Sequence, residues 1–482
     1  GSSRLGVLGL LTVGFPLARR ISGPQRLSAP LGIMVHPALV ACATGVGLLT
    51  DKYMLQVTNF MDHLSHMKAT PFEHEFVKAA MYGGAVLGMI IFGPLSDYVG
   101  RRVCLIACSA ITLLGALGST MAFSEGFLIA CRVVTGFGMG GEYPLAATHS
   151  ADSGDSDSGT KNVALLYLFG SGLGQASCPF TVWVLLKMGL PYEAVWRMTF
   201  GLGAVFAGVG LILRILVTRD SEKFKEARKS REESAIPPWA ALAFVPLAGT
   251  ALSWFLYDIV EYGLKQNDAA IFSTVGEDYS QIVFTVFLTR LLVIPSLVVA
   301  FFLPKCMATK WMQLLGFTGT AVVNLTLMIQ YDSLKQNGPV VLFDALYIIQ
   351  LSFQSLPGVT TMAIPAEIFP NAIKGTAHGI SAAMGKVGAT FGSYFFAFLK
   401  DQGNLSTIFG VVFGTSLFAA FLTTFLTPLY NGGTLDAMEV LAREGKESMA
   451  VKVLYSGKLV KVKATEDASD EEDTTTGESD AC

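Results

Sequence analysis

Three residues in the apolar run from Ala240 to Leu264 have the types and spacing of a binding surface. Trp254, Asp258 and Tyr262 are spaced four residues apart, so on a helix they share one face. The run is long enough to cross a bilayer, where a carboxylate costs about 2.5 kcal/mol or more. A chain keeps such a group where it faces protein or water and has a function. We therefore expect Asp258, with an aromatic ring one turn to either side, to line a binding site.

The composition indicates a membrane protein that crosses the bilayer many times. Of the 482 residues, 52% are hydrophobic and only 15% are charged, with a mean hydropathy of +0.52. A soluble chain would carry charge on about a quarter of its residues. The net charge of −3 argues against binding of nucleic acid. The seven cysteines show no metal-ligand spacing, so we expect no metal and no cofactor.

About twelve apolar segments have the length of a membrane span, roughly 20 residues each. One polar, basic interruption divides them into six plus six. The pattern predicts an all-α membrane protein with twelve transmembrane helices in two six-helix bundles. The expected parts are an N-terminal segment (1–35), a first bundle (36–217), a cytoplasmic linker (218–238), a second bundle (239–430) and an acidic, largely disordered tail (431–482).

Lysine and arginine gather in alternate loops, and this asymmetry predicts the orientation. The basic loops include Arg101, Arg102 and the central linker. We therefore expect both termini in the cytoplasm and the plasma membrane as the location, with an organelle membrane as the alternative. Residues 1–35 are either a targeting segment or an interfacial helix.

The loop between the second and third spans carries the motif G-x-x-x-D-x-x-G-R-R. Its members are Gly93, Asp97, Gly100, Arg101 and Arg102. Glycine permits a tight turn at the membrane surface, and Asp97 can accept hydrogen bonds from a helix N-terminus or pair with Arg101. The alternative is an ordinary basic loop that orients the protein and has no gating role. We favour a gating role, because the motif resembles the loop signature of the major facilitator superfamily.

Further charged residues lie inside the spans. Asp51, Arg132 and Glu142 would be costly if unpaired, so we expect them to neutralise one another or to titrate. They form either a structural ion-pair network or a proton path. Arg290 also needs a partner, for which Asp344 is the candidate.

Several motifs resemble those of the phosphate:proton symporter family of the major facilitator superfamily. The run Gly141–Thr148 reads G-E-Y-P-L-A-A-T, and Trp254–Gly263 matches W-F-x-x-D-x-x-x-Y-G. Ile364–Pro370 and His378–Lys386 are similar to late motifs of that family. The resemblance spans about residues 40–430 and includes motifs in both halves.

The resemblance implies roles for individual residues. Asp51 and Glu142 would carry protons and Tyr143 would contact phosphate, while Trp254, Asp258 and Tyr262 would form the second-half side of the site. Lys386, in the eleventh span, is either a positive charge for the anion or a lysine that extends to the membrane surface.

Three positions depart from the family pattern. Met54 stands where a second aspartate is common, and Gly358 stands where a substrate-binding asparagine is expected. The phosphate-holding glutamine of the fifth span aligns near Ser171, with Gln175 one turn further on the same face.

The sequence thus favours a proton-coupled inorganic phosphate symporter that works by alternating access. Its expected partners are inorganic phosphate, protons and the lipid bilayer. The alternatives are a carrier for another solute, such as a sugar, an organic anion or a phosphorylated metabolite, and a phosphate sensor that does not transport. An enzyme is not expected, because nucleophile motifs and phosphate-binding P-loops are missing from the sequence.

Overall fold

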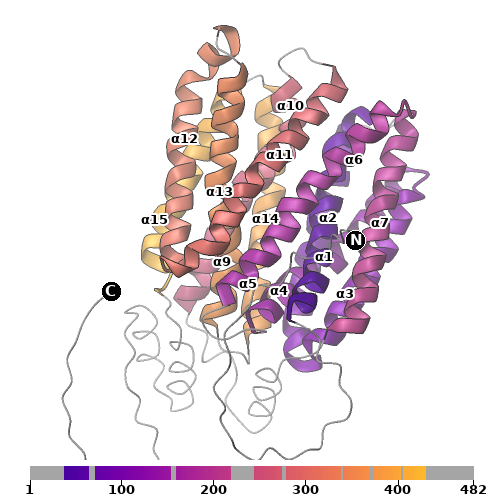
Figure 1. Ribbon diagram of the computed structural model, residues 1–482, viewed down its shortest axis with the longest axis vertical. Coiled ribbons are helices and arrows are strands. Elements are labelled where there is room, and N and C mark those ends of the chain that lie inside the picture. Colours follow the sequence, from indigo (N-terminus) through magenta and orange to yellow (C-terminus); the bar gives the residue numbers. More distant parts are fainter. Residues whose placement is uncertain are drawn as a thin grey trace, which may run out of the picture. The chain divides into compact units, whose positions relative to one another are not determined.

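Long helices make up nearly all of the regular structure in the computed structural model of this chain (Figure 1). The structure describes residues 37–64, 71–152, 159–218, 244–273, 278–337, 340–369, 373–402 and 405–429. The expected N-terminal segment and acidic tail, and all but residue 218 of the expected linker, lie outside these ranges.

Six helical spans precede the central linker. They are α1 (Pro37–Leu64), α2 (Pro71–Val99), α3 (Arg101–Thr120), α4 (Glu125–Asp152), the continuous unit of α5 (Gly159–Tyr167), η1 (Leu168–Gly174) and α6 (Gln175–Lys187), and α7 (Tyr192–Val217). The segment η1 is π-helical.

Six more spans follow the linker, together with two short helical segments. They are α9 (Phe244–Lys265), α11 (Tyr279–Phe302), α12 (Thr309–Asn337), α13 (Val340–Ile368), α14 (Lys374–Asp401) and α15 (Leu405–Leu426). The short segments are α10 (Asp268–Ser273) and η3 (Leu303–Lys305). The described residues therefore contain the twelve long helical units that the sequence predicts, six on each side of the linker.

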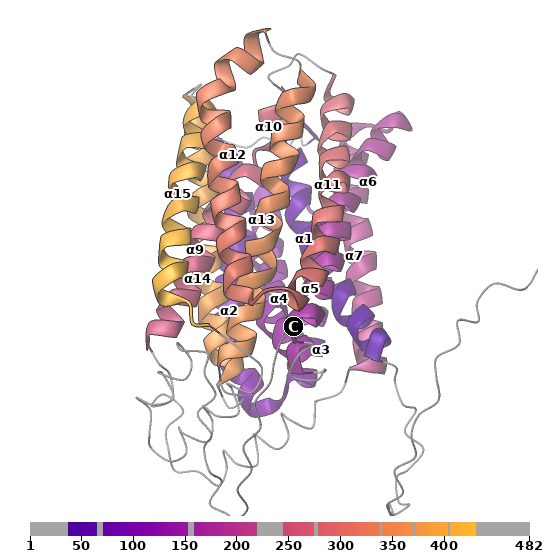
Figure 2. The ribbon, with the colours of Figure 1, turned by 60° about the vertical axis from the view of Figure 1, so that its left-hand side comes forward.

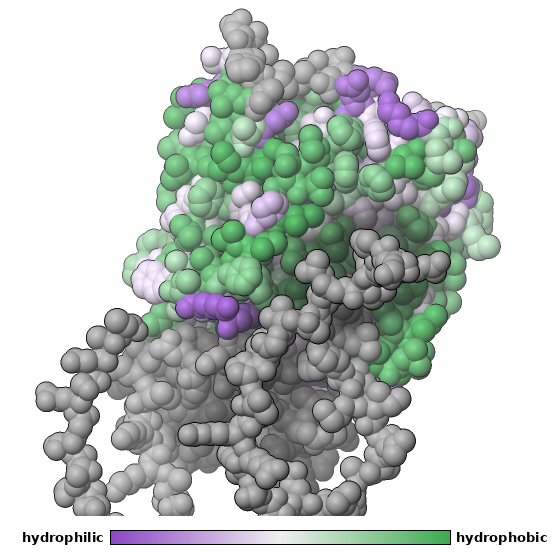
Figure 3. All heavy atoms as spheres, viewed as in Figure 1, coloured by the Kyte–Doolittle hydropathy of each residue, from purple (hydrophilic) through white to green (hydrophobic). Residues whose placement is uncertain are grey.

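The outward surface explains why these segments are helical. In lipid, every backbone polar group must be satisfied within its own segment, and a helix does this. Hydrophobic side chains cover most of the visible upper part of the molecule (Figure 3). Seven helices of the described part are long and apolar enough to cross a membrane by themselves. Among the spans outside that set, α1, α4, α9 and α14 each carry at least two buried charged residues.

The two halves meet along several helix pairs. The closest cross-half packing joins α2 to α14, α6 to α11 and α5 to α13 (Figure 2). Gly93 on α2 permits the first of these contacts, since a Cβ there would lie only 2.8 Å from the carbonyl oxygen of Gly375 on α14. Side chains of α1, α4 and α5 thereby face side chains of α9 and α14.

Candidate functional site

The Trp254 face of α9 is buried where the two halves meet. Trp254, Asp258 and Tyr262 each expose no more than 3% of their surface. The indole of Trp254 packs edge-on against His378 of α14, with ring centres 5.4 Å apart. A Cβ at Gly385 would lie 2.8 Å from the indole nitrogen, so this glycine lets α14 approach the ring. The spacing seen in the sequence thus does place the three side chains on one buried face.

Lys386 of α14 supplies the positive charge of this face. Its Nζ lies 2.7 Å from Asp258 Oδ2 in a buried ion pair, and it donates a 3.0 Å hydrogen bond to the Tyr262 hydroxyl. The ammonium also lies 5.0 Å from the centre of the Tyr143 ring of α4. Lys386 is 1% exposed, so it does not extend to the membrane surface.

A second lysine, which the sequence analysis did not single out, reaches the same tyrosine from the other half. Lys52 of α1 donates to the Tyr262 hydroxyl at 3.0 Å. Its Nζ lies 5.4 Å from the ring centre of Tyr143, 5.7 Å from that of Tyr167 and 5.2 Å from that of Tyr262. Its presence in an apolar span was the available signal, because a buried lysine in a span is by itself a reason to suspect a site.

The carboxylates of the first half have partners that differ from those expected. Glu142 forms its buried ion pair with Arg214 of α7, which also donates to the Ser109 hydroxyl. Arg132 instead donates to the Met54 carbonyl at 2.9 Å. The expected mutual neutralisation of Asp51, Arg132 and Glu142 is therefore wrong in its partners. Arg214 comes close enough to take this role because the missing side chain of Gly47 leaves space for the Glu142–Arg214 pair against α1.

Asp51 lies beside this pair with its own carboxylate unbonded. It is 0% exposed, and within the described residues neither of its carboxylate oxygens has a hydrogen-bond partner. Its electrostatic neighbours include Glu142, Arg214, Lys52 and Lys386. A buried polar group without a partner is costly, so the two unbonded oxygens of Asp51 suggest that this carboxyl group has a function.

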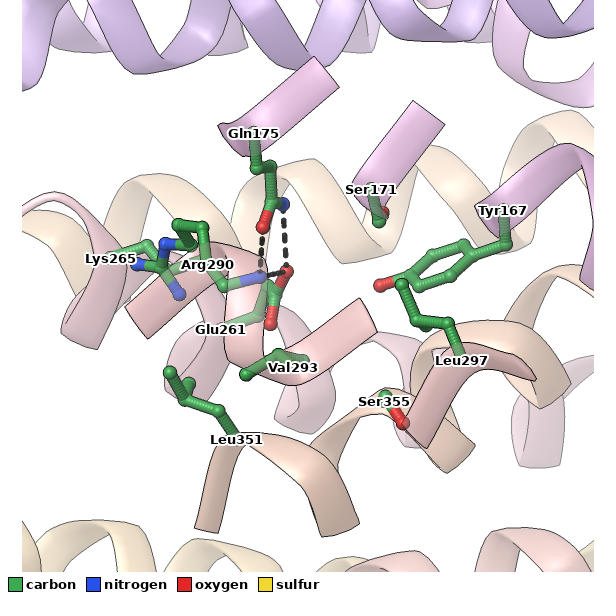
Figure 4. A pocket seen from close by; sticks show the side chains of 10 residues that line it. All are labelled: Tyr167, Ser171, Gln175, Glu261, Lys265, Arg290, Val293, Leu297, Leu351 and Ser355. Carbon is green, nitrogen blue, oxygen red and sulfur yellow. Dashed lines mark hydrogen bonds and ion pairs between the residues drawn. The ribbon is translucent and has the colours of Figure 1, made fainter. Parts of the chain in front are cut away.

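Ser171 and Gln175 line a small cavity (Figure 4), whose wall includes Tyr167, one of the tyrosines that surround Lys52. Gln175 accepts from Lys265 at 2.7 Å and donates to Glu261 at 3.4 Å, and Glu261 and Lys265 form an ion pair. The space holds about one water molecule. Its lining residues are Tyr167, Ser171, Gln175, Glu261, Lys265, Arg290, Val293, Leu297, Leu351 and Ser355.

Arg290 of this cavity forms its ion pair with Asp268 of α10, where the sequence had suggested Asp344. Asp268 also accepts a 2.6 Å hydrogen bond from the Tyr347 hydroxyl. The short helix α10 starts at Asp268, so the pair fixes α10 against α11 and α13.

Gly358 sits opposite two tyrosines that occupy the space of a side chain. A Cβ at Gly358 would lie 2.6 Å from the Tyr257 hydroxyl and closer still to that of Tyr167. These two hydroxyls are hydrogen-bonded to each other at 2.7 Å. The expected substrate contact at Gly358 therefore has no side chain to make it, and the tyrosine pair stands in its place.

The loop motif joins the two halves at one end of the helices. Asp97 accepts hydrogen bonds from the backbone nitrogen of Gly375 at 3.0 Å and from that of Thr376 at 2.9 Å. The Thr376 hydroxyl adds a third bond at 2.8 Å. Asp97 thus caps the N-terminus of α14, one of the two alternatives read from the sequence, and its charge complements the helix dipole.

The rest of the motif holds the first half together. Arg101 donates to the Thr148 carbonyl at 3.1 Å, and Arg102 donates to the Ile215 carbonyl at 3.4 Å. Gly100 has φ 112°, which favours glycine and permits the turn between α2 and α3.

A further contact joins the two halves. Glu367 of α13 accepts a hydrogen bond from Thr160 of α5, in the first half, and another from Thr309 of α12.

Twelve helical spans around a buried charged site between two halves define a membrane carrier. A family model described as "Sugar (and other) transporter" matches residues 50–237 and 269–442, more than half of the chain. The chain therefore belongs to this family of major facilitator superfamily transporters. It is an integral membrane transporter and not an enzyme.

Three of the curated relatives that match this chain share between 25% and 28% of their aligned residues with it. Inorganic phosphate transporter PT2 of Toxoplasma gondii is 28% identical over 368 residues, which cover 72% of this chain but only 63% of that protein. Glycerophosphoinositol permease 1 of Candida albicans is 27% identical over 77% of this chain and 74% of its own length. The repressible high-affinity phosphate permease of Neurospora crassa is 25% identical over 80% of this chain and 81% of its own.

Solved structures support the fold. The proton:xylose symporter XylE superposes with a TM-score of 0.72 and 16% sequence identity, covering 84% of this chain and 98% of that one. At this level of identity the likeness concerns the arrangement of helices only.

Proposed function

We propose that this protein is a proton-coupled inorganic phosphate symporter that works by alternating access. The observation that carries the proposal is the ion pair of Lys386 with Asp258, buried beside Tyr262, Trp254 and Tyr143 at the meeting of the two halves. Sites of secondary transporters lie between such halves. Relatives named as phosphate transporters or permeases support phosphate as the substrate.

The chemistry of an oxyanion fits the donors of this site. Phosphate needs positive charge and hydrogen-bond donors, which Lys386, the Trp254 indole and the hydroxyls of Tyr143 and Tyr262 can supply. With Asp258 ionised, Lys386 is already paired and the carboxylate repels an incoming anion. At 4 Å and an effective dielectric constant of 20, this repulsion is about 4 kcal/mol.

Protonation of Asp258 provides the proposed coupling. A neutral Asp258 releases Lys386 to the anion and can itself donate a hydrogen bond. Loss of the proton restores the Lys386–Asp258 pair and expels the anion. In this scheme Lys386 exchanges between one internal and one external partner, and the proton decides which partner it has.

Helix α14 links this exchange to the gate. Its first turn is capped by Asp97 of the other half, which accepts from the backbone nitrogens of Gly375 and Thr376. Lys386 lies eleven residues after Gly375, about 16 Å along the axis at the rise of an α-helix. A change of partner at Lys386 and a change of cap at Asp97 therefore act on the same rigid element. The motif end of the helices is the proposed cytoplasmic gate, with both termini on that side and the plasma membrane as the proposed location.

Asp51 is the better placed of the two first-half carboxylates to carry a proton. Glu142 is held by Arg214, whereas both oxygens of Asp51 lack a hydrogen-bond partner among the described residues. The proton path therefore includes Asp51 and Asp258, with Glu142 and Arg132 as its supporting charges.

A carrier for an organic phosphate is the second candidate. The cavity of Figure 4 is lined by hydroxyl and amide groups as well as Glu261, Lys265 and Arg290. Both cations are already held in ion pairs, with Glu261 and Asp268, so the hydroxyl and amide groups are left to bind a hydroxyl-bearing group. A relative named as a glycerophosphoinositol permease supports this candidate. In the described arrangement the cavity holds about one water molecule, so such a substrate requires it to widen.

Uptake into liposomes tests the proposal. The reconstituted protein is expected to accumulate labelled phosphate, faster with an inward proton gradient, and Asp258→Asn should abolish the response to the gradient. Asp401→Asn is the matched control, because Asp401 is an exposed aspartate at the end of α14, the helix that carries Lys386. Phosphate binding without uptake would favour the sensor, and uptake indifferent to both pH and Asp258→Asn would overturn the proposal.

A further inference from the structure

Lys52 is the positive charge of the site that the function proposed above does not use. It is 4% exposed, comes from the first half and donates to Tyr262 of the second half. Within the described residues it forms no ion pair with a carboxylate; its polar contact is the Tyr262 hydroxyl, and its other close neighbours are three tyrosine rings. A buried ammonium without an anionic partner is costly. The presence of Lys52 at this position is therefore explained if an anionic ligand binds to it.

The second cationic group of the site is close by. Lys52 and Lys386 each place Nζ 3.0 Å from the same Tyr262 oxygen, so the two nitrogens lie within about 6 Å of each other. At this distance two like charges repel strongly in a medium of low dielectric. An anion between them would remove the repulsion and give each ammonium a charge-assisted hydrogen bond.

Among the charged groups that act most strongly on Lys52 and Asp51, this pair of lysines remains as the net cation, while Arg132 is held apart at the Met54 carbonyl. Three nearby ion pairs cancel internally, namely Glu142 with Arg214, Glu261 with Lys265 and Asp268 with Arg290. The remaining carboxylates are Asp51 and Asp258. With both protonated, the site carries the two positive charges of Lys52 and Lys386, and with both ionised it is neutral.

We propose that Lys52 determines the charge of the substrate, so that the site takes doubly charged tetrahedral oxyanions in preference to singly charged ones. This inference rests on the proposed function. In the loaded site, Lys52 and Lys386 balance the two charges of hydrogen phosphate or of a phosphate monoester. A phosphate diester carries one charge and leaves one buried ammonium unbalanced. The proposal therefore ranks inorganic phosphate and phosphate monoesters above diesters.

The groups that face Lys52 come from every neighbouring element, and the charge count includes them. Tyr262, Asp258, Glu261 and Lys265 lie on α9, Lys386 on α14, Tyr143 on α4 and Tyr167 on α5. Asp51, next to Lys52 on α1, is in turn faced by Glu142 of α4 and Arg214 of α7.

Two competitors of fixed charge provide the test. Near neutral pH sulfate is doubly charged and dimethyl phosphate is singly charged. We would measure how strongly each inhibits uptake of labelled phosphate by the reconstituted protein. Sulfate is expected to inhibit at a concentration at least about tenfold lower than dimethyl phosphate, which corresponds to about 1.4 kcal/mol. Equal inhibition by the two in the unaltered protein overturns the proposal without any variant.

Three variants then assign the preference to Lys52. Lys52→Gln should reduce the ratio of sulfate to dimethyl phosphate inhibition by about tenfold, and Lys52→Arg should keep it. Lys187→Gln, which removes a lysine exposed at the end of α6, is the matched control and should leave the ratio unchanged. A ratio unaltered in Lys52→Gln overturns the role of Lys52 while phosphate uptake by the unaltered protein still stands. Absence of phosphate uptake in the unaltered protein contradicts the proposed function instead.

Should Lys52→Gln fail to fold, thermal stabilisation of the unaltered protein by the two anions tests the charge preference directly, since it needs no variant. Greater stabilisation by sulfate than by dimethyl phosphate supports the proposal, and equal stabilisation contradicts it.

Discussion

The second half contributes its site residues from two neighbouring helices, α9 and α14, which hold one ion pair and one aromatic face. The first half contributes its charges from α1, α4 and α7, where Glu142 is paired with Arg214 and Arg132 is bonded to the backbone of α1. The Lys386–Asp258 pair lies beside the Tyr262 hydroxyl, which also accepts from Lys52 of the other half. The Glu142–Arg214 pair is bonded to Ser109 of its own half. The comparison suggests that the Lys386–Asp258 pair opens to bind substrate, whereas the Glu142–Arg214 pair stabilises the first half.

Removal of Lys386 should have the largest effect. Lys386→Met leaves Asp258 as an unpaired buried charge, which costs about 3–5 kcal/mol of stability, and phosphate uptake should be lost. The double variant Lys386→Met/Asp258→Asn should regain thermal stability without uptake. Recovery of uptake in the double variant would show that the pair only supports the fold, which would remove the contrast between the halves.

Removal of Arg214 tests the other side of the contrast. Arg214→Met leaves Glu142 unpaired and should lower stability by about 3 kcal/mol or more, measured by thermal unfolding in detergent. The double variant Arg214→Met/Glu142→Gln should regain both stability and proton-driven uptake. If Glu142→Gln abolishes the response to the proton gradient while Asp51→Asn does not, the ranking of the two carboxylates is reversed.

A side chain at Gly358 should have an intermediate effect. Gly358→Asn would force apart the hydroxyls of Tyr167 and Tyr257, and overpacking of a buried site costs about 1–3 kcal/mol. Adding Tyr167→Phe, which removes the closer hydroxyl, should recover part of the melting temperature. Full stability of Gly358→Asn would mean that the tyrosine pair does not hold this space.

Loss of the α14 cap should be the smallest effect on stability. Asp97→Ala removes the acceptor of three hydrogen bonds, and loss of an N-cap costs about 1 kcal/mol. We expect a small fall in melting temperature and a larger fall in uptake rate, because the cap joins the two halves. An unchanged uptake rate would assign Asp97 to helix stability alone.

The parts of the site that follow from local spacing could be predicted from the sequence. The twelve spans follow from runs of apolar residues, and the Trp254 face follows from a four-residue repeat on one helix. The ability of Asp97 to cap a helix was also evident, although the helix itself, α14, was not. Local patterns therefore locate side chains on elements but do not identify their partners.

The remaining parts depend on contacts between distant segments. Lys52 meets Tyr262 across 210 positions of sequence, and Arg214 meets Glu142 across 72. A charged residue in an apolar span signals only that some partner exists. The hydrogen-bonded tyrosine pair at Gly358 could not be predicted either, because it depends on the space that a missing side chain leaves between three helices.

The π-helical segment η1 has a mechanical consequence. Its wider turns hold the backbone less tightly than α-helical ones, and such segments are frequent at functional sites. On one side α5 packs against α13, and on the other α6 packs against α11. Gly170 and Gly174 press directly onto α1 at Leu48 and Leu49, just before Asp51 and Lys52. The segment η1 therefore separates two ends of one span that pack against different helices, and a change in its geometry would act first on the part of α1 that precedes Asp51 and Lys52.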